Sequence, residues 1–154
     1  MKILTAAALA AALAACAPAM SSKPMDRPYS AGADKPLPPP KAGAVTIDLR
    51  KEDAGKTFTM KVGQRFSVSL VGVPTAGYLW APVNPPAFLK AVGDTSGPTH
   101  SDQLKPGFAG GNHWEVSVFE ATQPGKAILK FEQRRPWEKT EPPADTWSAT
   151  IEVK

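Results

Sequence analysis

Apolar and polar residues alternate with a period of two along most of the chain after residue 44. Successive side chains of a β-strand point to opposite faces, so this alternation predicts strands with one buried face and one solvated face. No segment keeps a helical period over a useful length. The apolar positions of the pattern are Val45, Ile47, Leu49, Phe58, Met60, Val62, Phe66, Val68, Leu70, Trp114, Val116, Val118, Ala127, Leu129, Phe131, Trp147, Ala149, Ile151 and Val153.

Glycine and proline interrupt the strands at short intervals, as in residues 62–64 and 122–125. Many short strands with such turns predict an all-β fold, an immunoglobulin-like antiparallel β-sandwich. Residues 45–154 are enough for one domain with a single core. The expected strands include residues 65–71, 78–82, a segment near 100–104, 112–121, 126–134 and 145–154.

Each strand of a sandwich reverses the direction of the chain, so alternate connections fall at the same end. This rule places residues 72–77 (the first loop), 105–111 (the second loop) and 135–144 (the third loop) together. Immunoglobulin-like domains carry their binding loops at one end in this way. The tight turn at residues 122–125 belongs to the other end. The sequence therefore predicts a sandwich with three binding loops at one end.

The chain begins in the manner of an exported protein. An alanine-rich apolar run follows Met1 and Lys2 and ends in Leu-Ala-Ala-Cys at Cys16. This ending resembles a bacterial lipobox, so we expect a signal peptide over residues 1–15 and a lipid anchor on Cys16 that attaches the chain to a membrane. Ala17 is similar to an outer-membrane sorting signal, which favours the bacterial cell envelope, periplasmic or surface-exposed. The alternative is an ordinary cleavage site with a coincidental cysteine.

Residues 16–44 contain scattered prolines, including Pro36 and the run at 38–40, and almost no sustained apolar pattern. They are typical of a stiff, extended tether, with a docking motif for another protein as the alternative. Cys16 is the only cysteine, so no intramolecular disulfide can form. The formal net charge of +4 comes without a long block of like charge. Together with export, this pattern argues against nucleic acid as a partner.

The first loop is more apolar than an idle turn needs to be. Pro74 fixes its own φ and favours an extended Val73, and Gly77 permits backbone angles that a Cβ atom would forbid. We therefore expect Thr75 to be held at the tip of a loop with one defined shape. The alternative is a plain hairpin connection with ordinary turn residues.

The other two loops carry unusual residues as well. Gly110 and Gly111 allow a close approach of backbone to another surface, or simply a flexible connection. The third loop opens with Arg135, Pro136 and Trp137. Tryptophan and arginine dominate binding hot spots, so this segment suits an interface anchor. Alternatively, Trp137 folds back over the edge of the sandwich with Arg135 stacked on it.

The order of these motifs resembles the chagasin-like family of cysteine-protease inhibitors. Members carry an Asn-Pro-Thr-Thr-Gly motif, a Gly-x-Gly-Gly motif and an Arg-Pro-Trp motif on three loops at one end of an immunoglobulin-like sandwich. The third motif is complete here, whereas the first and second are partial. The departures are Val73 and Ala76 in the first loop and Phe108 in the second, where Gly107 is displaced by one residue.

The resemblance implies a reversible, non-covalent inhibitor of papain-like cysteine proteases that is monomeric and needs no cofactor or metal. It places Thr75 near the catalytic Cys/His pair of the protease, with the second and third loops on the walls of the cleft. The implied protease-binding residues are Pro74, Thr75, Ala76, Gly77, Gly110, Gly111, Arg135, Pro136 and Trp137.

Two other classes of function compete with this interpretation. An enzyme has little support, because neither histidine lies in a known catalytic motif. His100 with Asp102, and His113 with Glu115, have the spacing of two ligands on one strand face, but a metal site needs more ligands than a pair. The second alternative is an envelope-anchored module that binds a peptide, a glycan or another envelope protein with the same loops.

Overall fold

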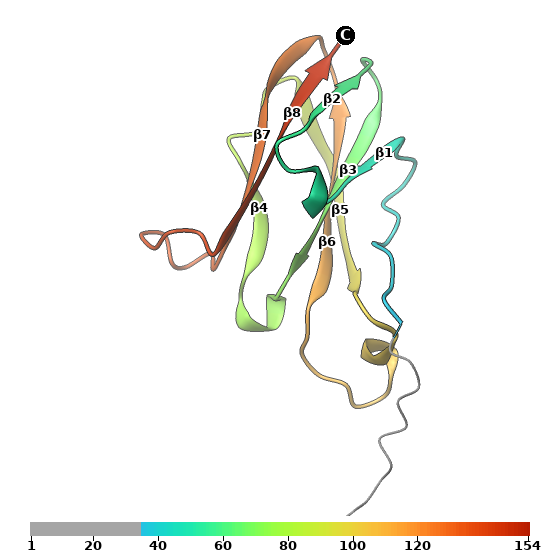
Figure 1. The fold of residues 1–154 in the computed structure, drawn as a ribbon, viewed down its shortest axis with the longest axis vertical. Helices are drawn as coiled ribbons and strands as arrows, with labels where there is room; N and C mark the ends of the chain where they lie inside the picture. The colour runs from blue at the N-terminus through green and yellow to red at the C-terminus, as the bar shows by residue number, and fades with distance from the viewer. Residues whose placement is uncertain (1–34) are drawn as a thin grey trace, which may run out of the picture. The chain divides into compact units, whose positions relative to one another are not determined.

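The chain folds into two packed four-stranded β-sheets (Figure 1). This computed structural model describes residues 35–154; the predicted signal peptide, Cys16 and the first part of the predicted tether lie outside these residues. The strands are β1 (Ile47–Leu49), β2 (Thr57–Met60), β3 (Arg65–Gly72), β4 (Leu79–Val83), β5 (Leu89–Pro98), β6 (His113–Ala121), β7 (Gly125–Arg134) and β8 (Asp145–Val153). Three 3-10 helices are η1 (Lys51–Asp53), η2 (Pro74–Ala76) and η3 (Ser101–Leu104).

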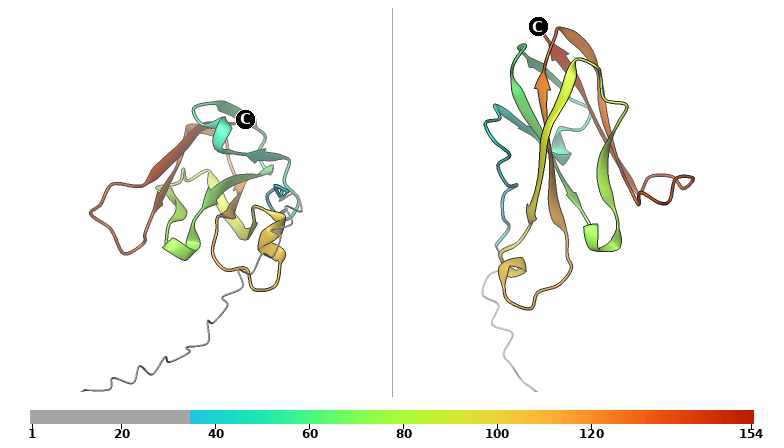
Figure 2. Two further views of the ribbon diagram at one scale, coloured as in Figure 1. Left: turned by 60° about the horizontal axis from the view of Figure 1, so that its bottom comes forward. Right: turned by 180° about the vertical axis from the view of Figure 1, so that it is seen from behind.

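The strand orders are β1-β3-β6-β5 and β2-β8-β7-β4. Most neighbours are antiparallel, but β1 runs parallel to β3 and β2 runs parallel to β8. The segment that contains η1 therefore crosses from one sheet to the other, and Figure 2 shows the two layers from two further sides. The predicted all-β, immunoglobulin-like sandwich is confirmed.

Aromatic side chains join the two sheets through the middle of the core. Phe66 on β3 stacks on Phe119 on β6 at a centroid distance of 5.6 Å. Phe119 meets Phe131 on β7 edge to face at 6.1 Å, and Phe131 meets Trp147 on β8 at 5.9 Å. All four are at most 1% exposed. Burying such large apolar side chains supplies much of the stabilisation of a domain without disulfides.

The strand expected near residues 100–104 is wrong, because part of that segment forms η3. The strand lies earlier, in β5, and pairs with β6. A register shift between Ala91 and Gly93 interrupts this pairing. Since β5 is an exposed edge strand with a bulge, no period-two pattern marks it in the sequence.

The two faces of β6 are the reverse of those expected from the alternation. Glu115 and Ser117 lie on the same face as Phe119, so they point between the sheets. The apolar residues Val116 and Val118 point outward, yet they are only 2% and 3% exposed. Another part of the chain must therefore cover the outer face of this sheet.

Residues 35–44, which we call the strap, lie along that outer face (Figure 1). The indole Nε1–H of Trp114 donates to the carbonyl oxygen of Leu37 at 2.8 Å. Further along, a Cβ atom on Gly97 would lie 3.2 Å from Cγ of Pro40. The part of the predicted tether that the structure describes is thus packed on the sandwich. Within residues 35–154, no helix is long and apolar enough to cross a membrane.

Candidate functional site

Strand pairing brings the three loops to one end of the sandwich. Gly72, at the end of β3, and Pro98, at the end of β5, both pair with His113 at the start of β6. In the other sheet, Leu79 at the start of β4 pairs with Arg134 at the end of β7. Asp145 at the start of β8 pairs with Gln133, the residue before Arg134. The expected grouping of the loops is confirmed.

Its own backbone closes the first loop into a tight turn. Val73 and Tyr78 exchange two hydrogen bonds between N–H and C=O groups, at 3.1 and 3.2 Å. Inside this pair, the N–H of Gly77 donates to the carbonyl oxygen of Pro74 at 2.9 Å, and the φ angle of Gly77 is +82°. The loop therefore has one defined shape, with Thr75 and Ala76 exposed at its tip.

The third loop holds the first loop from the side. Arg135 donates from Nε to the carbonyl oxygen of Ala76 at 2.9 Å. Its guanidinium group lies 4.5 Å from the ring centroid of Tyr78, and Nη1 pairs with Glu138 at 2.9 Å. The hydrogen bond that Arg135 donates to Glu138 raises the pKa of Arg135. The cation–π partner of Arg135 is thus Tyr78, so the alternative in which Arg135 stacks on Trp137 is wrong.

Trp137 packs against the first loop at Gly77. A Cβ atom on Gly77 would lie 2.3 Å from Cη2 of Trp137, so only glycine fits beneath this ring. The remainder of the indole is open, and the residue is 67% exposed. The geometry makes the first and third loops one unit that presents a large aromatic surface.

Polar groups close the base of the second loop. Gln103 accepts at Oε1 from the N–H of Thr99 at 2.5 Å and donates from Nε2 to the carbonyl oxygen of Asn112 at 2.6 Å. Gly110 and Gly111 have φ angles of +86° and +91°, which confirms that these positions use conformations that favour glycine. Thr99 and Gln103 carry no motif that the sequence could have revealed.

Phe108 at the tip of the second loop is 46% exposed, and its ring lies 3.4 Å from where a Cβ atom on Gly111 would stand. Leu104 in η3 is more exposed still. The second loop therefore presents apolar side chains at the same end of the molecule as Trp137.

Glu115 lies between the two sheets and contacts Gly72 and Trp80, on the two strands that flank the first loop. Its Oε2 accepts from the backbone N–H of Trp80 at 2.9 Å, which ties β6 to β4 across the two sheets. Its Oε1 occupies the space beside Gly72, where a Cβ atom would lie 1.8 Å away. Among the described residues, neither Oε1 nor Nδ1 of His113 has a hydrogen-bond partner. Burial raises the pKa of Glu115, against the opposing effect of the Trp80 hydrogen bond.

The raised pKa of Glu115 predicts a specific pH dependence of stability. The folded state binds this proton more tightly than the unfolded state, so the free energy of unfolding should fall as pH rises above about 4.5. Glu115→Gln should remove that contribution. Urea unfolding measures the free energy of unfolding of the variant minus that of the original chain. This difference should be lower at about pH 5 than at about pH 7. An identical stability difference at both values would contradict this role of the carboxyl group.

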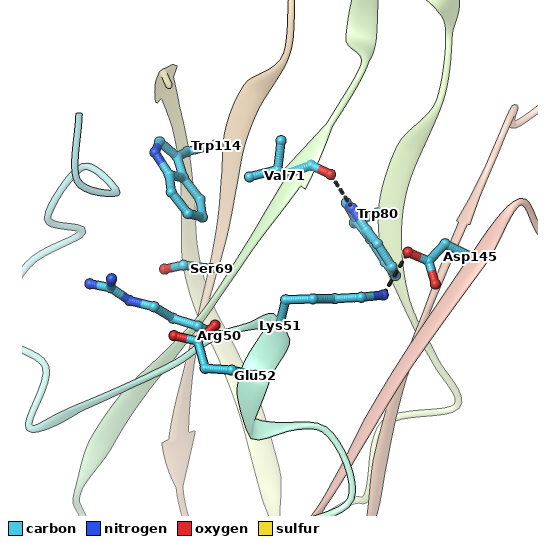
Figure 3. A pocket seen from close by; sticks show the side chains of 8 residues that line it. All are labelled: Arg50, Lys51, Glu52, Ser69, Val71, Trp80, Trp114 and Asp145. Atoms are coloured by element: carbon cyan, nitrogen blue, oxygen red, sulfur yellow. Dashed lines mark hydrogen bonds and ion pairs between the residues drawn. The ribbon is translucent and has the colours of Figure 1, made fainter. Parts of the chain in front are cut away.

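A small pocket of about 250 Å³ lies beside Trp80 (Figure 3). Lys51 extends across it, with Nζ 5.1 Å from the centroid of the Trp80 ring and 2.5 Å from Oδ2 of Asp145. Arg50 at its edge is paired with Asp48. Arg50 and Lys51 are thus engaged within the protein, and Lys51 links η1 to β8.

The two His–carboxylate pairs considered as metal ligands gain no further ligands in the described part of the chain. Residues 35–154 contain no group of three or more His, Cys, Asp or Glu side chains placed to hold a metal ion. Instead, His100 begins η3, and His113 lies beside Glu115 at the root of the first loop.

Comparison with known proteins agrees with the loop geometry. The model of the chagasin family of peptidase inhibitors (I42) matches residues 59–151, which include all three loops. The chain belongs to the chagasin family. Comparison with curated proteins gives no match.

Solved structures show the same fold. The cysteine protease inhibitor EhICP2 from Entamoeba histolytica has a TM-score of 0.61 and 18% identity, covering 72% of this chain and all of its own. Amebosin has a TM-score of 0.54 and 25% identity, covering 70% of this chain and 97% of its own. PbICP-C, solved in complex with falcipain-2, has a TM-score of 0.46 and 20% identity, with coverage of 70% and 99%. Each of these three structures is matched over nearly its whole length.

Proposed function

We propose that this chain is a reversible, non-covalent inhibitor of papain-like cysteine proteases that places its first loop in the active-site cleft. The clamp of Arg135 and Trp137 on that loop is the observation that carries this proposal. Support comes from membership of a family of peptidase inhibitors and from the fold shared with EhICP2, which is named as a cysteine protease inhibitor.

The first loop suits a wedge that resists cleavage. A protease binds its substrate as an extended strand, whereas Pro74–Ala76 is a 3-10 turn closed by the Val73–Tyr78 pair. Thr75 at the exposed tip is the residue nearest to the catalytic groups in this arrangement. Because the loop is ordered before binding, association avoids much of the entropy cost of fixing it. The chain itself performs no chemistry in this mechanism.

The other two loops contact the walls of the protease cleft in this arrangement. Trp137 supplies a large aromatic surface on one side, and Phe108 supplies a smaller one from the second loop. Gly110 and Gly111 let the backbone of the second loop approach the protease closely. Val73, Ala76 and Phe108 make this surface more apolar than the usual family pattern, and we propose that they determine which proteases are bound.

We also propose that the mature protein is a monomer held at the bacterial outer membrane by a lipid on Cys16, facing the periplasm or the cell surface. The support is the lipobox-like sequence before Cys16 and the following Ala17. Labelling cells with a radioactive fatty acid should give a labelled protein, and Cys16→Ser should abolish the label. Unchanged labelling of that variant would overturn the anchor.

Titration of papain with the full chain tests the function directly. Hydrolysis of a fluorogenic peptide by papain should fall to near zero at micromolar protein, with one inhibitor bound per enzyme, while trypsin should be unaffected. Full papain activity at that concentration would contradict the proposal and favour a binding module for another envelope component.

Arg135→Lys should weaken inhibition of papain about fivefold to tenfold. Lysine keeps the charge but loses the flat guanidinium that bonds to Ala76 and stacks on Tyr78, so the first loop is less firmly held. Arg65→Lys is the matched control, since Arg65 at the start of β3 pairs with Glu120 on β6, at the opposite end of the sandwich from the three loops. Inhibition constants within twofold of the original are expected for the control; equal losses in both variants would show that the clamp has no special role.

A further inference from the structure

The strap begins at the loop end of the sandwich and bonds to the chain that leads into the second loop (Figures 1 and 2). Leu37 donates its N–H to the carbonyl oxygen of Thr99 at 2.7 Å. Lys35 both donates to Oγ of Ser101 at 3.1 Å and accepts from the N–H of Ser101 at 3.0 Å. These bonds make a short stretch of antiparallel pairing beside η3.

The composition of the strap suits this position. Pro36 and the prolines at 38–40 have no N–H group, so Leu37 holds the single backbone donor of residues 36–40, and that donor is used. The carbonyl oxygen of Leu37 is also used, by the indole of Trp114. A proline-rich segment is already extended before it docks, so it loses little conformational entropy on packing.

The surface under the strap is shaped to receive it. Gly97 on β5 lacks a side chain where Pro40 comes closest. On the neighbouring β6, Val116 and Val118 are buried although they lie outside the core between the sheets. Contact therefore extends along much of the strap.

The partners of the strap are also the partners of the second loop. Thr99 accepts from the strap through its carbonyl oxygen and donates its N–H to Gln103. Gln103 donates in turn to the carbonyl oxygen of Asn112, where β6 is about to begin. Hydrogen bonds thus run without a break from Leu37 across the base of the second loop.

We propose that the strap is a positioning element for the second loop, which makes protease binding depend on residues that precede the family fold. The matched family segment starts at residue 59, so the strap is an addition to it. The effect on inhibition rests on the proposed function, whereas the effect on the order of the loop does not. A loop held at its base loses less freedom when it binds, which lowers the cost of association.

Two substitutions in the full chain release the strap in different ways. Leu37→Pro removes the donor to Thr99 within a run that is already proline-rich. Trp114→Phe removes the indole donor to Leu37 and keeps an aromatic ring. Lys41→Pro is the matched control, because it adds a proline to the same run and its N–H donates no hydrogen bond within residues 35–154.

Two measurements then test the proposal. Amide hydrogen exchange of Ser101 and Gln103 should become faster in both releasing variants, and their inhibition constants for papain should rise about fivefold. The control should match the original chain in both measurements, and all variants should stay folded at the assay temperature by thermal unfolding. Unchanged exchange in both releasing variants would overturn the strap as a positioning element, and so would faster exchange with unchanged inhibition. If the original chain does not inhibit papain, the proposed function fails while the exchange data still decide the role of the strap.

Discussion

Gly77→Ala should weaken inhibition of papain about a hundredfold. Alanine at a φ of +82° costs about 1–2 kcal/mol, and the new Cβ atom would lie 2.3 Å from Cη2 of Trp137. Relief of this overlap requires the indole to move off the first loop, which breaks the unit that enters the cleft. The strained φ angle lowers the stability of the fold, whereas the displaced indole weakens binding by about 2.7 kcal/mol, and the inhibition constant measures this second effect.

Gly63→Ala separates the two causes. Gly63 has a φ of +84°, but no atom lies within 4 Å of the position of its Cβ, and it sits in the turn between β2 and β3. This control should lose similar stability in urea unfolding while it inhibits papain as strongly as the original chain. If Gly77→Ala also inhibits papain normally, the packing of Trp137 on the first loop has no bearing on binding.

Trp137→Ala should weaken binding to papain by about 2 kcal/mol, or roughly 30-fold, mainly through faster dissociation. The indole combines a fixed position on Gly77 with a large exposed surface, which is typical of an interface anchor. Surface plasmon resonance on immobilised papain gives both rate constants.

Ile128→Ala is the matched control for the loss of an exposed apolar side chain. Ile128 lies on β7 and is 64% exposed, close to the 67% of Trp137, but it is outside the three loops. Its removal should change the dissociation constant less than twofold. Equal effects of the two substitutions, or none for Trp137→Ala, would remove Trp137 from the binding surface.

Strands with one buried face were the predictable part of the fold. Phe66, Phe131 and Trp147 lie in the core as their alternation indicated. β5 could not be found in this way, because its exposure as an edge strand and its bulge between Ala91 and Gly93 remove the periodic signal. The alternation of apolar and polar residues therefore predicts a strand where one face of it packs on the core. It does not predict a strand that forms only through pairing with its neighbour.

The reversed faces of β6 have a different cause. Period two shows that Trp114 and Val116 share a face, but it cannot show which face is inside when both are covered. The strap covers the outer face, and its proline-rich sequence also suits a free tether. The hydrogen bonds of the strap with Thr99, Ser101 and Trp114 distinguish the two possibilities.

In the candidate site, chain order and parity were enough to bring the loops to one end. Residues far apart in sequence make the contacts within it, and these had no sequence signal. Arg135 was recognised, but its partner Tyr78 was not, and neither was the fit of Trp137 over Gly77. Glu115 stands at a polar position of the alternation, yet it bonds to Trp80 between the two sheets at the base of the first loop.

The most direct test of the whole account is whether the chain still binds papain when the active-site cleft is already filled. Calorimetry should show one full-length chain bound tightly per papain. Affinity should fall at least about a hundredfold when a peptidyl chloromethyl ketone has alkylated the catalytic cysteine and filled the cleft. Equal affinity for open and filled papain would contradict the account, because the first loop would then bind outside the active site.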